Sequence, residues 1–339
     1  MPHHNFIASG VVVHNCHFCY ASLQSSTDGG EITKQHALDF LSDAADIGVK
    51  GISLISDGES TLVPFYADSI EHATKCGLKI GAGTNGILLK RPVLERILPH
   101  LSFLRFNFSA GEKARYAQIM GVPQAMYDIV VQNIKDGMEI INRDGLGCTL
   151  NLQIVLHPKD GDQIIPFAKL AAELAPSYAV IKHCSDGDDG QLGVDYDKYA
   201  ALEDQLHEAE EIGKRAGVRI TVKWNRINAK CGRNYSKCFG PPFQMQLSGN
   251  GLVAPCGLKF NSKFSALHIG NITRTRFRDI WASDRYKEVM DYLGSDAFDP
   301  RQRCAPGCLQ NPTNEFLFAL VNGTTELPTG TPPPHLEFI

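Results

Sequence analysis

The sequence lacks a marked excess of charge, a long hydrophobic run and a secretory signal. Its 339 residues hold 33 Lys and Arg against 37 Asp and Glu, a formal net charge of -4. That near balance provides no electrostatic argument for binding nucleic acid or an anionic membrane surface. No apolar run approaches the roughly 18 residues that a membrane helix needs, and the N-terminus has neither a basic nor an apolar signal region. We therefore expect a cytoplasmic protein with no nucleic-acid or membrane partner.

Cysteine, in contrast, is abundant. The chain has ten cysteines within an ordinary globular composition of 43% hydrophobic and 21% charged residues. In a reducing compartment, clustered cysteines more often bind metal or carry out redox chemistry than form disulfides. One group is a Cys-x-x-Cys at residues 16 and 19, and five more cysteines lie in the last third. Cys76 and Cys148 lie apart from both groups, and we expect them in the hydrophobic core.

Residues 30–225 alternate between helical and strand-like patterns. Helical stripes are expected at 33–47, 64–76, 91–99, 124–143, 163–174 and 197–216, and strands at 50–56, 78–82, 101–109, 149–156, 178–182 and 218–224. Repeated strand–helix units favour a parallel sheet, wound as a barrel or an open sheet. The chemistry should then lie at the carboxyl ends of the strands, where polar residues occur at 58–60, 84–86, 109 and 182–183.

The alternation of helical and strand-like patterns ends at about residue 226. Short segments rich in glycine and cysteine follow, with one helix expected at 276–293. This composition indicates a small domain folded around a ligand, and the proline-rich residues 322–339 indicate a loose tail.

The first residues carry a separate motif. His4-Asn5-Phe6 is followed by His14-Asn15-Cys16, which resembles the C-terminal splice block of an intein and its junction. The resemblance implies that Cys16 accepts the upstream segment as a thiolate. Asn15 would cyclise and cut the 15–16 bond, with His14 and His4 assisting. Fifteen residues cannot build a splicing domain, so we expect an intein body in a longer reading frame or in a partner chain.

The Cys-x-x-Cys motif follows the junction directly. Alone it fits zinc, a redox dithiol or part of an iron-sulfur site. Cys16-His17-Phe18-Cys19-Tyr20 resembles the end of the Cys-x3-Cys-x-aromatic-Cys motif of radical S-adenosylmethionine (SAM) enzymes. The resemblance implies that Cys16 and Cys19 bind a 4Fe-4S cluster. The family's first cysteine would stand at Val12, and we expect it to come from the upstream extein on splicing.

Further positions extend this resemblance. Gly58-Glu59-Ser60 is similar to the family's Gly-Glu motif, which binds the amino group of SAM, and Asn107 and Ser109 stand where the family contacts SAM. The resemblance also implies roles near the cofactor for Phe18 and Tyr20. The alternative interpretation of residues 58–60 is an ordinary turn with no role in binding. The alternative interpretation of Lys182 and His183 is a strand end whose hydrogen bonds are satisfied.

The C-terminal cysteines resemble a SPASM or twitch extension, which binds auxiliary 4Fe-4S clusters. We expect Cys238, Cys256, Cys304 and Cys308 to hold one cluster, with Cys231 as a spare. A zinc site is the alternative, because four thiolates also suit tetrahedral zinc. The number of auxiliary clusters stays open between one and two.

Together the resemblances imply a partial (β/α)6 TIM-type barrel of the radical SAM kind with a small auxiliary-cluster domain. The expected domains are an intein remnant at 1–15, the barrel at 16–225 (its first strand upstream), the cluster domain at 226–321 and the tail at 322–339. Such an enzyme cleaves SAM to a 5′-deoxyadenosyl radical that abstracts hydrogen from a peptide or small-molecule substrate. A flavodoxin or ferredoxin would supply electrons. An inactive fragment and a non-catalytic zinc-binding module are the alternatives.

Overall fold

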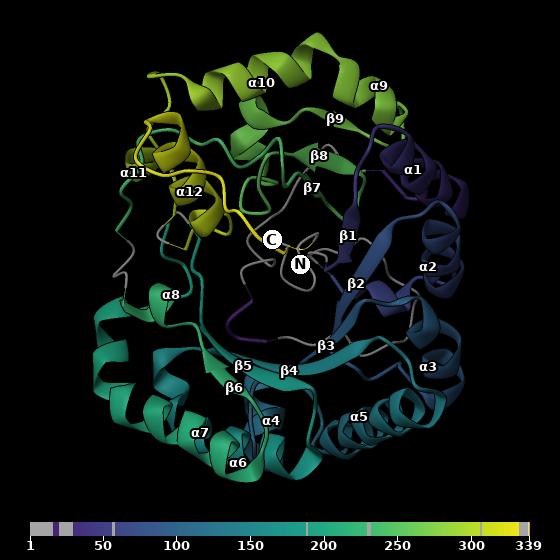
Figure 1. The fold of residues 1–339 in the computed structure, drawn as a ribbon, viewed down its shortest axis with the longest axis vertical. Helices are drawn as coiled ribbons and strands as arrows, with labels where there is room; N and C mark the ends of the chain where they lie inside the picture. Colours follow the sequence, from purple (N-terminus) through teal and green to yellow (C-terminus); the bar gives the residue numbers. More distant parts are fainter. Residues whose placement is uncertain are drawn as a thin grey trace.

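A computed structural model describes the chain at residues 16–19, 30–55, 58–187, 189–228, 232–305, 307–331 and 338. Six parallel strands form one sheet in sequential order, and β1 and β6 are its two edges in the described chain (Figure 1). Such a sheet is an incomplete barrel, as predicted. The strands are β1 (Gly51–Leu54), β2 (Lys79–Thr84), β3 (Phe103–Asn107), β4 (Thr149–Leu156), β5 (Tyr178–His183) and β6 (Ile220–Val222).

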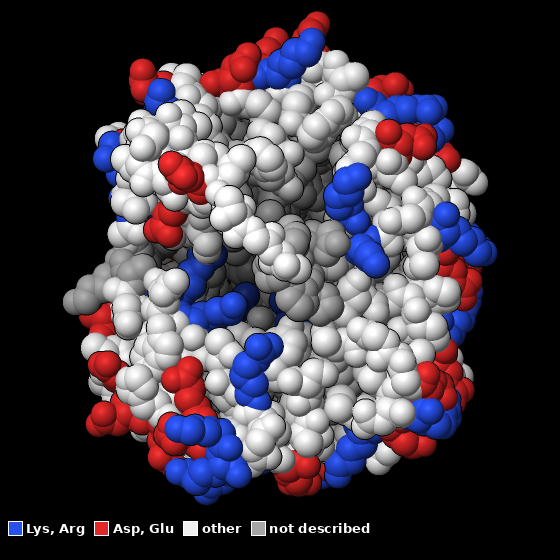
Figure 2. Space-filling view, in the orientation of Figure 1, with Lys and Arg blue, Asp and Glu red and all other residues white. Residues whose placement is uncertain are grey.

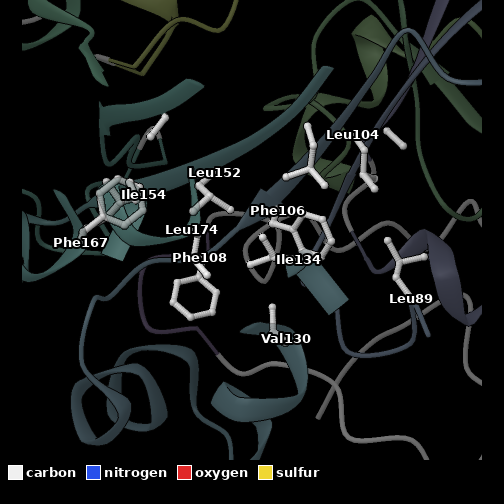
Figure 3. Close-up of a cluster of buried hydrophobic side chains, with 14 of the residues drawn as sticks. Leu89, Leu104, Phe106, Phe108, Val130, Ile134, Leu152, Ile154, Phe167 and Leu174 are labelled. Carbon is white, nitrogen blue, oxygen red and sulfur yellow. The ribbon is translucent and has the colours of Figure 1, made fainter. Parts of the chain in front are cut away.

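Helices cover the outer, convex side of this sheet, and the inner side faces a central space (Figure 1). They are α1 (Lys34–Asp46), α2 (Tyr66–Lys75), α3 (Arg91–Ile97), α4 (Lys113–Met120), α5 (Ala125–Asp144), α6 (Ile164–Leu174), α7 (Glu203–Ala216) and α8 (Trp224–Asn228). The main core lies between the sheet and these helices, where Phe106 and Leu152 of the strands meet Ile134 of α5 (Figure 3).

Helix α5 shows how the sequence builds this layer. Val130, Ile134 and Ile141 recur at helical spacing and are buried, which places one apolar stripe against the sheet. Gly137 lies on the same face, where a Cβ would stand 2.8 Å from Leu150 of β4. The helix ends at Gly145, whose φ of +61° suits the left-handed conformation of a C-terminal cap.

The C-terminal region forms a second, smaller unit. Strands β7 (Gln246–Leu247), β8 (Leu252–Ala254) and β9 (Gly270–Asn271) make an antiparallel sheet. Its helices are α9 (Phe277–Ala282), α10 (Asp284–Gly294), α11 (Pro300–Arg303) and α12 (Asn311–Val321). This unit lies across the open side of the barrel, so the whole chain forms a ring (Figure 1), and the same face is hollowed at its centre (Figure 2).

Helices α1 and α9 join the two units. The fully buried Asp43 of α1 accepts two hydrogen bonds from the Arg276 guanidinium, at 2.6 and 2.9 Å. Beside this pair, the rings of Phe40 and Phe277 meet edge to face with centroids 4.9 Å apart. A polar and an apolar contact therefore fix the C-terminal unit to the first helix.

Several local predictions were incomplete or wrong. The helix expected at 276–293 is two helices, because Ser283 adopts an extended backbone and caps α10 by accepting a hydrogen bond from the Tyr286 amide. The segment Tyr196–Leu202 is a 3-10 helix that precedes α7. Cys148 is buried as expected, but Cys76 is half-buried beside His72 and Ser42 rather than in the core. Helices α4 and α12 were not predicted.

None of the helices in the described ranges is long and apolar enough to cross a membrane.

Candidate functional site

The Cys-x-x-Cys motif forms a tight turn across the carboxyl edge of the sheet. The Cys19 amide donates to the Cys16 carbonyl at 3.0 Å, and the His17 amide donates to the carbonyl of Ile119 at the end of α4. On the other side, the Cys184 thiol, just beyond β5, lies 3.7 Å from the Phe18 carbonyl oxygen. Phe18 itself is buried. The turn is therefore enclosed between α4 and the end of β5.

A buried carboxylate also lies against this turn. Asp160, in the 3-10 helix Pro158–Gln163 after β4, is almost fully buried. Its Oδ2 lies 2.8 Å from His17 Nε2, and its Oδ1 accepts from Arg115 of α4 at 3.0 Å. The His157 ring stands edge to face with the His17 ring at 5.7 Å. His17, inside the Cys-x-x-Cys motif, is thus positioned by Asp160 and His157, which are distant from it in sequence.

Glu59 follows β1, as the sequence predicted, and is buried. Its Oε1 accepts hydrogen bonds from the Thr61 amide and hydroxyl and from the Thr84 hydroxyl, at 2.7 to 3.2 Å. Its Oε2 accepts from the Asn85 amide at 2.7 Å. Among the described residues, Oε2 thus accepts one hydrogen bond and Oε1 accepts three, so Oε2 is the oxygen with more capacity for a further donor. The adjoining Gly58 is exposed, and Ser60 begins the 3-10 helix Ser60–Leu62 that Glu59 caps.

The other expected SAM contacts lie on neighbouring strands of the same edge. Asn107 ends β3, and its side-chain oxygen accepts from Gln153 of β4 at 3.0 Å. Ser109 is buried, and its hydroxyl accepts from the Val155 amide at 3.2 Å. Both residues therefore link β3 to β4 at the edge where the Cys16–Cys19 turn lies.

The thiol of Cys16 is held in an environment that disfavours its charge. Burial raises its pKa above the usual range, and the neighbouring Cys19 and Glu59 raise it further. Its sulfur lies 3.8 Å from the Met120 sulfur. A bound iron centre would offset this cost, because metal binding displaces the thiol proton. The soft sulfur donors and the apolar surroundings fit an iron-sulfur cluster, and this chain supplies two of the three thiolates of the family pattern.

The four C-terminal cysteines that the sequence grouped do come together. Cys238, Cys256, Cys304 and Cys308 line one pocket, together with apolar side chains such as Leu258, Leu293 and Phe298. Burial, together with the neighbouring Cys308 and Cys304, raises the pKa of Cys238 to about 12. Burial likewise raises the pKa of Cys256, with Cys308, Cys304 and Cys238 adding to the shift. The thiols are thus close enough to influence one another electrostatically.

The residues that line this pocket fit a metal group. A four-iron cluster is held by four thiolates on different irons, and tetrahedral zinc also takes four thiolates. Four cysteines around one apolar pocket supply that number of thiol ligands.

Two arginines that the sequence analysis missed hold the loop with Cys304 and Cys308. Arg226 of α8 donates to the carbonyls of Cys308 and Leu309, the latter at 3.2 Å. Arg233 donates to the carbonyls of Cys304, at 3.4 Å, and Ala305. The sequence offered one indication that these arginines lie near the cluster site, namely their positions on either side of Cys231. They place positive charge where thiolate ligands would carry negative charge.

Several predicted site residues lie outside the described part of the chain. They are His4, His14, Asn15, Tyr20 and Cys231. The proposed splice junction and the spare cluster ligand are therefore predictions from sequence.

Two family models match the parts of the chain that contain these cysteines. The sequence model of the Radical SAM superfamily matches residues 13–171. The SPASM model, described as an iron-sulfur cluster-binding domain, matches residues 238–309. The first domain implies a 4Fe-4S cluster and SAM, and the second implies auxiliary iron-sulfur clusters.

Among curated proteins, the chain is 24% identical over 293 residues to an AdoMet-dependent heme synthase from Methanosarcina barkeri, covering 79% of this chain and 78% of that protein. It is 25% identical over 208 residues to a probable GTP 3′,8-cyclase from Pyrobaculum aerophilum, covering 61% and 65%.

Among solved structures, the fold is similar to that of Streptococcus suis SuiB bound to the precursor peptide SuiA, with a TM-score of 0.61 and 17% identity. That match covers 82% of this chain but only 64% of SuiB. The fold is also similar to that of anSMEcpe with bound AdoMet, with a TM-score of 0.61, 14% identity, and coverage of 93% and 95%. With a radical SAM domain that includes the Cys16–Cys19 turn and a SPASM domain that spans the four-cysteine pocket, this chain is a SAM-dependent enzyme of the radical SAM superfamily.

Proposed function

We propose that this enzyme cleaves SAM reductively at a cluster held by Cys16 and Cys19 and modifies a peptide or small-molecule substrate by hydrogen abstraction. The observation that carries the proposal is the Cys16–Cys19 turn, enclosed at the carboxyl edge of the parallel sheet beside Glu59. When bound, the cluster supplies the electron that breaks a carbon–sulfur bond of SAM.

The residues around the turn would bind and orient the cofactor. Glu59 Oε2 has more capacity than Oε1 for a further donor, which suits the ammonium group of SAM, while the existing hydrogen bonds fix the carboxylate. Asn107, at the end of β3, and Ser109, two residues beyond that strand, would also contact SAM. Phe18 and the Met120 side chain would exclude water from the thiolates.

The auxiliary cluster would be held by Cys238, Cys256, Cys304 and Cys308. The pocket that these cysteines line supports this assignment, with Cys231 as a fifth candidate. A peptide substrate is supported by the similarity in fold to SuiB, whose solved structure contains a precursor peptide. A small-molecule substrate is the alternative supported by the similarity to the archaeal heme synthase.

The missing third thiolate allows a direct test. In a chain carrying Asn15→Ala to block cleavage at the junction, Val12→Cys restores the family spacing of Cys-x3-Cys-x2-Cys. We expect bound iron to rise from about four to about eight atoms per chain, with reductant-dependent formation of 5′-deoxyadenosine. Val11→Cys and Val13→Cys add the same thiol at the wrong spacing and serve as matched controls. Equal iron and equal product in all three variants would contradict the proposal.

We further propose that the mature enzyme obtains this cysteine by protein splicing at Asn15 and Cys16. The support is the motif His14-Asn15-Cys16 with Val12 at the position of the first ligand. With an intein body and upstream extein supplied, Asn15→Ala should block excision, because only a side-chain amide can cyclise there. Cys19→Ala should splice normally, as judged by the mass of the ligated product, but release no 5′-deoxyadenosine. Failure of the unaltered junction to splice would remove this route while leaving the Val12→Cys result valid.

A further inference from the structure

The segment that follows β5 is folded around one buried carboxylate. Asp186 is 3% exposed, and its Oδ1 accepts hydrogen bonds from the amides of Gly187 and Leu192 at 2.7 and 2.9 Å. Its Oδ2 accepts from the Val194 amide at 3.2 Å. A carboxylate that binds three backbone amides holds its segment in one conformation. The described residues of this segment, which we call the β5 loop, are 184–187 and 189–194.

The β5 loop contacts the Cys-x-x-Cys turn through two side chains. The buried thiol of Cys184 lies 3.7 Å from the Phe18 carbonyl oxygen. Burial is the largest of the causes that raise the pKa of Cys184 to about 12, so this thiol stays protonated at neutral pH and can donate. Nε2 of His157 lies 3.4 Å from the Leu192 carbonyl oxygen, and the same ring meets the His17 ring edge to face. Both contacts depend on the shape of the loop.

The same loop also contacts the C-terminal domain. Gly307, next to Cys308, is buried, and a Cβ built on it would stand 2.7 Å from the Cβ of Ser185. Two Cβ atoms cannot come so close, so only glycine allows this approach. Farther along the loop, Asp189 forms an ion pair with Lys263. The β5 loop therefore connects the turn of the first cysteine site to the chain that carries the second.

We propose that the β5 loop couples the two cysteine sites, so that a metal group bound by the C-terminal cysteines orders the Cys-x-x-Cys turn. Ligation of Cys308 would fix Gly307 against Ser185, and Asp186 would hold Ser185 and Cys184 in place beside the turn. Coupling of this kind passes through contiguous packed contacts. The inference rests on the proposed function, because it takes the C-terminal cysteines as the auxiliary metal site and the turn as the SAM-cluster site.

The reactivity of the thiols in the turn tests this coupling in the chain as it stands. Alkylation of Cys19 by iodoacetamide, followed at each cysteine by mass spectrometry, is compared between the metal-loaded unaltered chain and the metal-free Cys256→Ala chain. We expect the bound metal group to slow the alkylation of Cys19 by about fivefold or more. Cys76, half-buried beside α1 and outside both sites, is the internal reference and should react equally fast in both chains.

The variant Gly307→Ala separates the coupling from metal binding. Its added methyl group would meet Ser185, yet it leaves all four thiols of the C-terminal site in place. We expect this chain to keep its metal while Cys19 reacts as fast as in the metal-free variant. Gly257→Ala is the matched control, because it also adds a methyl group beside a cluster cysteine. There the new Cβ would lie 3.4 Å from Leu309, an ordinary contact, and Cys19 should stay protected.

Changes on the barrel side of the contact complete the test. Adding Ser185→Gly to Gly307→Ala removes the two nearest atoms, at 2.7 and 2.9 Å, and should restore part of the protection. Ser185→Val alone crowds the same contact and should expose Cys19, which decides the test if Gly307→Ala loses its metal. Asp189→Asn breaks only an exposed ion pair, so it should change the rate by less than about twofold.

The inference is overturned if Cys19 reacts at one rate in the unaltered, Cys256→Ala and Gly307→Ala chains. It is also overturned if the metal-loaded Gly307→Ala and Ser185→Val chains keep Cys19 protected. Zinc in place of iron would overturn the cluster assignment alone, because a thiol rate needs only a bound metal group. Normal SAM cleavage by the spliced Cys19→Ala protein would overturn the proposed function and leave the coupling standing. A chain whose C-terminal cysteines bind no metal would overturn both.

Discussion

The barrel and the C-terminal domain assemble their cysteines in different ways. In the barrel, Cys16 and Cys19 lie on one local turn, which α4 and β5 enclose. In the C-terminal domain, four cysteines drawn from residues 238 to 308 meet only because that domain folds. In the proposed assignment, the first site needs one further cysteine, whereas the second has four cysteine ligands within residues 238–308. Cluster retention should therefore differ between the two sites.

The iron content of the purified chain should show the largest difference between the two cysteine sites. Purified without oxygen, the unaltered chain should hold about four iron atoms with matching sulfide, because the C-terminal site alone offers four thiolates. Cys256→Ala should remove nearly all of this iron, while Cys16→Ala should change it little. Cys76→Ala, outside both sites, is the control. Equal iron loss from the Cys16 and Cys256 variants would show that the sites are not independent, and zinc in place of iron would contradict both.

The second prediction concerns how much the contact between the barrel and the C-terminal domain stabilises the fold. Phe277 is 6% exposed and packs against Phe40 of α1. Phe277→Ala should lower the free energy of unfolding by about 3–5 kcal/mol through lost contacts and a cavity. Phe243→Ala, at a site 67% exposed, should change it by less than about 0.5 kcal/mol. Chemical denaturation of the cluster-loaded chains measures both, and similar values would show that the α1–α9 contact does not stabilise the fold.

The arginines beside the C-terminal cysteines should affect the reduction potential of the auxiliary cluster. Arg233 donates to carbonyls of the loop that carries Cys304 and Cys308. Arg233→Met removes a cation near the auxiliary cluster, so its reduction potential should become more negative by tens of millivolts, as read by potentiometric titration with paramagnetic resonance. Arg219→Met, which loses a cation stacked on Tyr178 in the barrel, should leave that potential unchanged. A shift of the same size in both variants would contradict a local effect.

Acid sensitivity should be absent at neutral pH and should belong to the barrel as the pH falls. Burial, together with the cations of Arg226 and Lys182, lowers the pKa of His183 to about 3. The folded state therefore keeps this imidazole neutral, whereas the unfolded chain takes up a proton below its ordinary pKa of 6.5. Stability is complete above pH 6.5 and falls as the pH drops from there toward 3, by up to about 1.4 kcal/mol per pH unit. His183→Asn should flatten this limb in denaturation measured at several pH values, and an unchanged limb would contradict the assignment.

Much of the fold could be read from local patterns. The six strands and most barrel helices occur where apolar periodicity placed them, because each element buries one face against its sequence neighbours. Gly145 and Gly217 end α5 and α7 in the left-handed conformation. The helices that were predicted wrongly or not at all have local causes. Ser283 divides a continuous helical pattern by capping α10, and α4 is a short helix whose burial depends on the strands beneath it.

The sequence by itself determined the chemistry: a Cys-x-x-Cys motif, a Gly-Glu pair after a strand, and cysteines grouped near the C-terminus. Spacing along the chain carries that information, because residue type decides which ligands can be bound. Only the tertiary structure decided which groups surround those residues. It brought Arg226 and Arg233 to the loop of Cys304 and Cys308, and it put Asp160 beside His17 of the Cys-x-x-Cys motif. Such neighbours are distant in sequence and are brought together by parallel strand register and by the closure of the ring, which no local pattern encodes.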